Sequence, residues 1–403
     1  MGFNNPAMPW RELERRLSDR ELEPVNSSSR GSDENDSQTW PLRRVSFTSH
    51  GVRRFKAAIP YAELHTHSHF SFLDGASSPE ELVLEAERLG LEALALTDHG
   101  GFYGVVRFAE AAREIGLPTV FGAELTVDAW KPEENSTLDV NPRDPSRVGT
   151  TDPPGKRLVV LARHPDGYAS LAALLSRSQM AGKKGAPHLP MSELISAVNR
   201  HRGDWALLTS GRRGAVPTAL KTEGISGARR ELCRLIEAAG NDNVFVELWH
   251  HGDPSDDARN DRLADLALEQ KVGLLCTNGV HYATPSRRHL AWAMSAIRSR
   301  RSLDEIDGWL PGHGSAHLRS GLEQARCFSR YPGVVEAAAE LGRECAFDLS
   351  LVAPNLPPYP CPNDMNEMSY LHKIVHEGAE RRYGPQSAEA IAGAWQQISH
   401  ELA

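Results

Sequence analysis

Histidines at alternate positions mark the most unusual segment of the chain, which reads LHTHSHFSFLDG over residues 64–75. On a β-strand, residues i and i+2 point to the same face, so His65 and His67 would lie side by side after a short apolar run. Neutral imidazoles are common ligands of zinc, manganese and iron, and Asp74 follows seven residues after His67. The pattern predicts a metal-binding pair, although a histidine-rich surface strand without a ligand role has the same spacing.

Apolar runs typical of strands alternate with helical runs from residue 58 onward. Ser78-Pro-Glu-Glu81 has the form of a capping box and predicts the start of one of these helices. Such alternation favours parallel strands joined by crossover helices. We therefore predict an α/β fold, a seven-stranded variant of the (β/α) barrel, with an open doubly wound sheet as the alternative. The strands are expected at residues 61–66, 93–98, 118–127, 157–162, 205–210, 244–249 and 272–278.

Potential metal ligands fall where these strands end, which is where a parallel barrel places its chemistry. Six of the seven strand ends carry an imidazole or a carboxylate, and only the end at Thr209-Ser210 lacks a strong ligand. Histidines with purely structural roles explain this coincidence poorly, because each strand end would need a separate packing reason for its polar residue. The candidates are His65, His67, Asp98, His99, Glu124, His164, Glu247, His250, His251 and His281.

The composition limits the classes of function. The net charge is −8 over 403 residues. Nucleic-acid-binding proteins usually have an excess of basic residues, so any DNA contact would be local. Five cysteines without a CxxC pair fit a reducing cytoplasm. No apolar run reaches the roughly 18 residues of a membrane span, and no signal peptide is evident. We expect a cytoplasmic protein without a membrane partner or a small-molecule cofactor.

Changes in composition predict three regions. Residues 1–57 form a polar, low-complexity extension that we expect to be disordered, residues 58–285 form the barrel, and residues 286–403 form a mostly helical region. A polar segment at 128–156 is expected to be a surface insertion, and the proline-rich segment 351–364 an extended linker.

Basic residues cluster beside Trp292, at Arg287-Arg288 and from Arg298 to Arg301. They could contact a nucleic-acid backbone. A solvated helix face or contacts within the molecule is the favoured interpretation.

The motifs HTHSHFSFLDG, LTDHG, GAEL, VELWHHGD and TNGVHY, in this order and spacing, resemble the polymerase-and-histidinol-phosphatase (PHP) superfamily of metal-dependent phosphoesterases. The run at 70–116 and the segment CAFDLSLVAPNLPPYP at 345–360 are similar to the PHP domain and the start of the polymerase core in C-family bacterial polymerases. Within that group the chain is most similar to the error-prone, damage-induced alpha subunits.

This resemblance implies a distorted seven-stranded barrel with a cluster of divalent ions, which would be zinc, manganese or iron. In relatives with complete ligand sets, such clusters support 3′→5′ exonuclease or phosphatase activity through a metal-activated water. Asp98 would be a ligand or would orient an imidazole, whereas His69 and His250 fall outside the pattern. The implied metal ligands are His65, His67, Asp74, His99, Glu124, His164, His251 and His281.

Two departures from the family pattern qualify these expectations. Gly279 stands where the family places an aspartate two residues before the final histidine, so we expect incomplete metal binding and weak or absent cleavage. The chain also lacks the PDxD-type palm motif whose carboxylates would hold magnesium for nucleotidyl transfer. We therefore interpret it as the N-terminal piece of a longer DNA polymerase, either a truncated product or a fragment, that would not polymerise alone.

DNA and proteins of replication and mutagenesis would be the partners of that longer polymerase. Two alternatives remain open from the sequence. One is a free-standing metal phosphoesterase that acts on phosphate monoesters, and the other is a metal-free scaffold that binds partner proteins.

Overall fold

The computed structural model describes residues 57–128, 155–182, 187–306, 314–349, 359–362, 365–388, 391 and 393–402. Residues 1–56 of the predicted extension, the core of the predicted insertion at 128–156 and most of the predicted linker at 351–364 lie outside the described residues.

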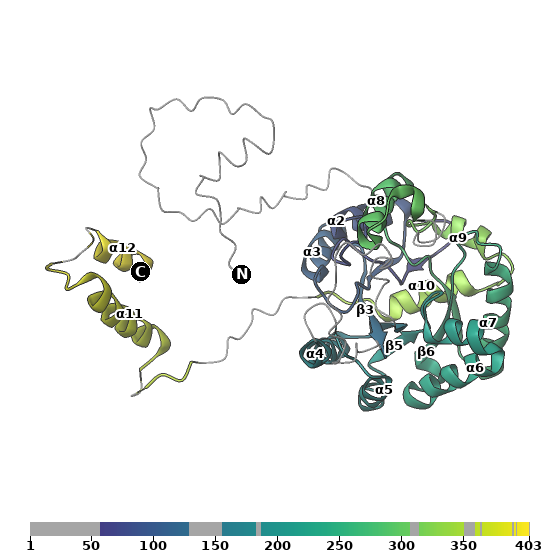
Figure 1. Ribbon diagram of the computed structural model, residues 1–403, viewed down its shortest axis with the longest axis horizontal. Coiled ribbons are helices and arrows are strands. Elements are labelled where there is room, and N and C mark those ends of the chain that lie inside the picture. Colours follow the sequence, from purple (N-terminus) through teal and green to yellow (C-terminus); the bar gives the residue numbers. More distant parts are fainter. Residues whose placement is uncertain are drawn as a thin grey trace, which may run out of the picture. The chain divides into compact units, whose positions relative to one another are not determined.

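Seven strands form one curled sheet and follow one another in chain order (Figure 1). Their side chains are almost all buried, as expected for a sheet covered on both faces. Each strand overlaps the range predicted for it, so the predicted seven-stranded α/β barrel is confirmed. The strands are β1 (Ala62–Glu63), β2 (Ala93–Leu96), β3 (Thr119–Val127), β4 (Lys156–Ala162), β5 (Trp205–Leu208), β6 (Val244–Leu248) and β7 (Gly273–Cys276).

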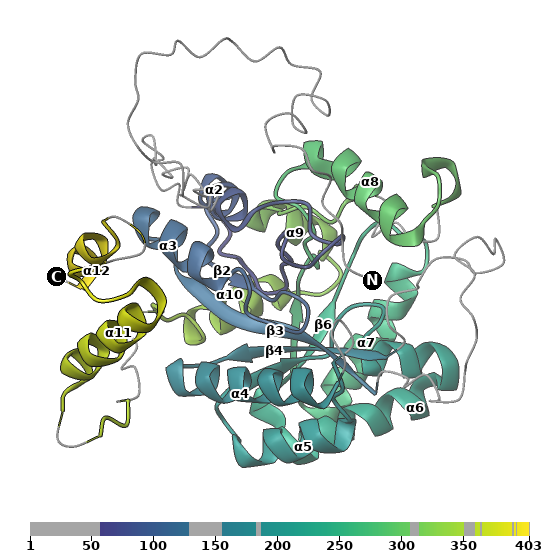
Figure 2. The ribbon, with the colours of Figure 1, turned by 60° about the vertical axis from the view of Figure 1, so that its left-hand side comes forward.

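The direction of β4 departs from the prediction. β4 pairs antiparallel with both β3 and β5, whereas all other neighbouring strands are parallel (Figure 2). The expectation of uniformly parallel strands was therefore wrong here. β3 and β4 pair as the two arms of a hairpin, with Val127 opposite Lys156, and such a pair needs no crossover helix. As a result, β4 begins at the end of the barrel where its neighbours finish.

Helices cover the outside of the sheet (Figure 1). The predicted capping box is present, because the Ser78 hydroxyl accepts from the Glu81 amide while the Glu81 carboxylate accepts from the Ser78 amide. These helices are α2 (Pro79–Leu89), α3 (Val105–Ile115), α4 (Pro165–Ala181), α5 (Met191–Arg200), α6 (Ala215–Ala239) and α7 (Asp256–Gln270), with a short η1 (Asn241–Asn243) before β6.

The barrel closes through the segments that follow β1 and β7. Thr66 and Val280 form a parallel bridge. The His67 amide donates to the Val280 carbonyl at 2.8 Å, and the Val280 amide donates to the His65 carbonyl at 2.8 Å. The backbone of both histidines is therefore fixed by the seam that closes the barrel.

The described residues after 285 are mostly helical, as predicted. One of its helices, α10, packs against β1, β2 and β7 and thus contributes to the barrel, while the domain boundary at residue 285 stays a prediction. None of the helices among the described residues is both long and apolar enough to span a membrane. These elements are η2 (Pro285–Arg287), α8 (Arg288–Ser299), η3 (Leu303–Glu305), α9 (Gly321–Cys327), α10 (Val334–Glu344), α11 (Glu367–Tyr383) and α12 (Ala394–Leu402).

The contact between α10 and β1 can be tested by overpacking. A Cβ at Gly342 would lie 2.5 Å from the Cβ of Ala62, so we expect Gly342→Val to lower the free energy of unfolding by about 1–3 kcal/mol. Urea denaturation would measure the change. Glu340→Val, on the exposed side of the same helix, is the matched control. Equal stability of the two variants would contradict the role of α10 in the barrel.

Candidate metal centre

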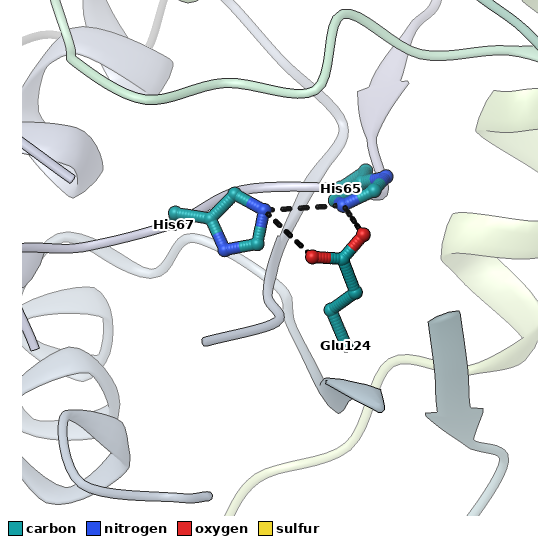
Figure 3. A group of neighbouring side chains, drawn as sticks. All are labelled: His65, His67 and Glu124. Atoms are coloured by element: carbon teal, nitrogen blue, oxygen red, sulfur yellow. Dashed lines mark hydrogen bonds and ion pairs between the residues drawn. The ribbon is translucent and has the colours of Figure 1, made fainter. Parts of the chain in front are cut away.

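Three buried side chains bring metal-type donor atoms together at the end of the barrel where the parallel strands finish. His65 and His67 follow β1, and Glu124 lies on β3 (Figure 3). One donor atom from each lies within 4.8 Å of the others. Nε2 of His67 is 3.2 Å from Nε2 of His65 and 3.8 Å from Oε2 of Glu124. The alternation of the HTH motif therefore places both imidazoles on one side, as the sequence predicted.

A second carboxylate, Glu247, orients His65 from behind. Its Oε1 accepts from Nδ1 of His65 at 2.8 Å, which leaves Nε2 facing Glu124 at 3.5 Å. Burial opposes a charge on His65, but Glu247 and Glu124 raise its pKa to about 10. A carboxylate behind an imidazole fixes the ring and strengthens it as a ligand. The sequence indicated Glu247 only as a strand-end carboxylate, not as the partner of His65.

Asp98 holds the loop between the histidines and Asp74. It accepts from the Ser68 amide at 2.7 Å, from the Ser68 hydroxyl at 2.8 Å and from the Ser71 hydroxyl at 2.7 Å. The Ser71 hydroxyl in turn lies 3.4 Å from Nδ1 of His67. Of the two roles predicted for Asp98, this arrangement fits the orienting one.

Asp74, His99 and His281 form a second group next to the first. Oδ2 of Asp74 is 2.6 Å from Nε2 of His99 and 3.4 Å from Nδ1 of His281, and Nδ1 of His99 is 2.8 Å from Oε2 of Glu124. The structure therefore brings six of the eight predicted ligands together, and their roles as ligands stay predictions.

Two arginines enter the same cluster, and the sequence did not identify either as part of it. Arg157, at the start of β4, contacts the Glu124 carboxylate and places Nη1 2.8 Å from Nδ1 of His99. Arg298 on α8 donates to Oδ1 of Asp74 at 2.7 Å. Although burial opposes it, these arginines and the neighbouring histidines hold the pKa of both Glu124 and Asp74 well below the usual range.

Arg157 lies in the cluster because β4 runs antiparallel to β3. On the sheet, Arg157 pairs with Thr126, which shares a face with Glu124, so its guanidinium can reach that carboxylate. A parallel β4 would have placed Arg157 at the opposite end of the barrel. A prediction that residues 118–162 form a hairpin would have placed Arg157 beside Glu124.

The same reversal places His164 away from the other predicted ligands. His164 follows the C-terminal end of β4, which lies at the far end of the barrel. There it caps α4, where its Nδ1 accepts from the Gly167 amide at 3.3 Å, and its Nε2 lies 3.4 Å from Asp204. The expectation that His164 joins the other predicted ligands is therefore not met.

His251 lies near the cluster but is engaged elsewhere. Its Nε2 donates to the Asn278 carbonyl at 2.7 Å, and burial lowers its pKa to about 3. The indole of Trp249 contacts both rings, with centroids 5.2 Å from His65 and 5.2 Å from His251. His251 is thus neutral and faces the backbone of the loop that carries Gly279.

Gly279, the departure from the family pattern, is tightly coupled to Trp249. It has a positive φ of 50°, and a Cβ built on it would lie 2.3 Å from Cζ2 of Trp249. The Trp249 Nε1 donates to Glu247 at 2.7 Å, which anchors the indole. An aromatic ring therefore occupies the space beside residue 279 that the side chain of an aspartate would need.

Contacts within the molecule account for much of the basic segment beside Trp292. Arg287 pairs with Glu81, the Arg288 guanidinium lies 4.9 Å from the centre of the Trp292 ring, and Arg298 binds Asp74. These residues fit the interpretation favoured from the sequence.

The residues of the first group fit a divalent ion. Their mixed nitrogen and oxygen donors suit zinc, manganese or iron, and all three side chains are buried. Burial and the neighbouring histidines hold the pKa of His67 well below its usual value, whereas Glu247 and Glu124 raise that of His65, so an ion would displace a proton from His65 on binding. A further buried nitrogen, Nδ1 of His281, makes no hydrogen bond, and its ring centre lies 5.0 Å from that of His67.

Comparison with known proteins agrees with this geometry. The family model described as PHP domain matches residues 63–251, which include β2 to β6 and the donor residues His65, His67 and Glu124. Along its whole length the chain is similar to proteins named error-prone DNA polymerase. It is 44% identical to the error-prone DNA polymerase of Nocardia farcinica, with 100% of this chain and 37% of the relative covered.

The corresponding protein of Mycobacterium bovis is 46% identical, with 100% of this chain and 35% of the relative covered. That of Cutibacterium acnes is 42% identical over 95% of this chain and 32% of the relative. The chain therefore spans about a third of the length of these relatives.

The Gly279–Trp249 contact predicts that the aspartate of the family cannot simply be restored. We expect Gly279→Asp to lower the free energy of unfolding by about 1–3 kcal/mol, because the new side chain meets the indole. Gly252→Asp is the control, since Gly252 also has a positive φ, of 83°, but no atom within 4 Å of its Cβ position. Urea denaturation should show the larger loss of unfolding free energy for Gly279→Asp. The same substitution made in a Trp249→Leu background should cost less. If Trp249→Leu leaves the loss unchanged, the indole is not its cause.

Proposed function

We propose that this chain is the N-terminal part of an error-prone DNA polymerase, in which the PHP barrel binds a divalent metal ion and has weak or absent 3′→5′ exonuclease activity. The observation that carries the proposal is the match to error-prone polymerases at 44–46% identity over 100% of this chain. That match extends past the PHP domain into the helical region after residue 285, which favours the polymerase over a free-standing phosphoesterase.

The barrel's own residues would perform distinct tasks at the metal. Nε2 of His65, Nε2 of His67 and the Glu124 carboxylate would hold the ion, which supplies Lewis acidity when bound. Glu247 keeps the His65 ring in place through its bond to Nδ1. Ser210 donates to Oε1 of Glu124 at 2.8 Å, which fixes the carboxylate that both imidazoles face.

Nucleotidyl transfer belongs, in this proposal, to the rest of the longer protein, where palm carboxylates would hold magnesium. The substrate would be DNA, and the partners would be proteins of replication and damage-induced mutagenesis. We place the protein in the cytoplasm. The names of the relatives support the assignment to DNA synthesis.

Substitutions at a donor, at its supporting carboxylate and at a nearby histidine outside the donor group test the metal site. We expect His67→Ala to abolish high-affinity Zn²⁺ or Mn²⁺ binding, because it removes a donor from the buried group. We expect Glu247→Gln to weaken binding by about 10–100-fold, because it loosens the His65 ring. Competition with a chromogenic chelator would measure both. His69→Ala is the control, since His69 lies outside the donor group, and equal losses in all three variants would argue against this site.

Nuclease activity should be at most weak. We expect the purified chain, supplied with Mn²⁺ or Zn²⁺, to remove 3′-nucleotides from a labelled primer far more slowly than a proofreading exonuclease, and not to extend the primer with deoxynucleotides. Gel analysis of the primer would measure both reactions. Rapid degradation that His67→Ala abolishes would contradict the weak-nuclease proposal. Metal-dependent hydrolysis of a phosphate monoester, lost in the same variant, would instead support a free-standing phosphoesterase.

A further inference from the structure

The two arginines in the cluster lie where the second group of predicted ligands would bind cations. Arg157 contacts Oε2 of Glu124 and approaches Nδ1 of His99, and these two atoms are themselves only 2.8 Å apart. Arg298 binds Oδ1 of Asp74, whose other oxygen faces His99 and His281. Each guanidinium therefore takes a position next to a carboxylate that a bound ion would otherwise share with histidine.

A guanidinium can replace the charge of a metal ion but cannot bind one. It remains protonated in proteins and offers only N–H donors, without a lone pair for coordination. A divalent ion placed between the same oxygen and nitrogen atoms would lie within a few ångströms of this positive charge. In a buried site that repulsion is weakly screened, and the side chain of Arg157 is 10% exposed and that of Arg298 is 15% exposed.

The charges of the two carboxylates are already balanced. Glu124 and Asp74 carry one negative charge each, and Arg157 and Arg298 carry one positive charge each. Buried carboxylates are stable when they are paired in this way, so Asp74 and His99 need no further cation. The first group differs, because Nε2 of His65 and Nε2 of His67 face each other, and Oε1 of Glu124, which faces His65, is not the oxygen that Arg157 contacts.

We propose that Arg157 and Arg298 are permanent cations that replace metal ions in the Asp74–His99 half of the cluster, so that the barrel holds a single divalent ion at His65, His67 and Glu124. The proposal rests on the metal site of the proposed function and specifies its stoichiometry. A single ion cannot clamp both the attacking and the leaving oxygen of a phosphodiester as a two-metal site does. The arginines thereby give a structural reason for weak nuclease activity that is separate from Gly279.

Metal stoichiometry of the full chain tests this proposal directly. Wild type, Arg157→Gln, Arg298→Gln and Arg157→Lys would be equilibrated with excess Zn²⁺ or Mn²⁺, freed of unbound metal by gel filtration and measured by inductively coupled plasma mass spectrometry. We expect wild type and Arg157→Lys to hold one ion per chain, because both keep the positive charge. We expect the glutamine variants to hold an additional ion.

A stability measurement provides a second readout. In the presence of EDTA, the glutamine variants should melt at lower temperature than wild type, because Glu124 or Asp74 has lost its cation, and added Zn²⁺ or Mn²⁺ should restore part of the loss. Arg229→Gln is the control, since Arg229 pairs with Glu269 at the surface and its loss removes the same charge away from the cluster. Its ion count should equal that of wild type.

The outcomes separate this proposal from the metal site itself. A wild type without any ion would refute the metal site, whereas the difference between the glutamine variants and wild type judges the arginines. Two or more ions in wild type, or no additional ion in a folded glutamine variant, would overturn the proposal. If Arg157→Gln does not fold, Arg298→Gln decides the question, because Arg298 lies on α8 outside the seven-stranded sheet.

Discussion

The carboxylate of Glu124 sets the arrangement of this end of the barrel. It is buried on β3, and an isolated buried carboxylate is too costly to persist. Its charge is compensated from several separate segments: His65 from the closing seam, His99 from the end of β2, and Arg157 from the start of β4. The Ser210 hydroxyl adds a hydrogen bond from the end of β5. The strands that meet here are therefore coupled by one charge as well as by the sheet.

Much of this architecture is legible in the sequence because it depends on local patterns. The alternation of apolar runs predicted seven strands in the correct order, and the HTH spacing predicted two imidazoles on one face. What the sequence missed depends on direction and register. The reversal of β4 moves His164 away and brings Arg157 in, and neither residue carries a local signal of that reversal. Arg298 on α8 reaches Asp74 through a tertiary contact that periodicity cannot reveal.

Gly279 has a packing role that its sequence position alone does not indicate. As a sequence feature it is only the loss of one possible ligand. In the structure its backbone has a positive φ and lies directly against the Trp249 indole. The same indole is hydrogen-bonded to Glu247, the carboxylate that orients His65. The packing at Gly279 therefore supports a neighbouring donor, so Gly279 and Trp249 act as one feature.

The charge balance of the cluster would allow the barrel to be retained with the reduced metal site proposed above. A cluster built only from carboxylates and imidazoles needs its ions to offset the negative charge of the buried ligands. Here Arg157 and Arg298 perform part of that task with covalently attached charges. The contacts that join β2, β3, β4 and α8 then do not depend on how many ions are bound. Cleavage by a two-metal clamp, which needs ions at both the attacking and the leaving oxygen, would weaken while the barrel that packs α10 against β1 and β7 stays intact.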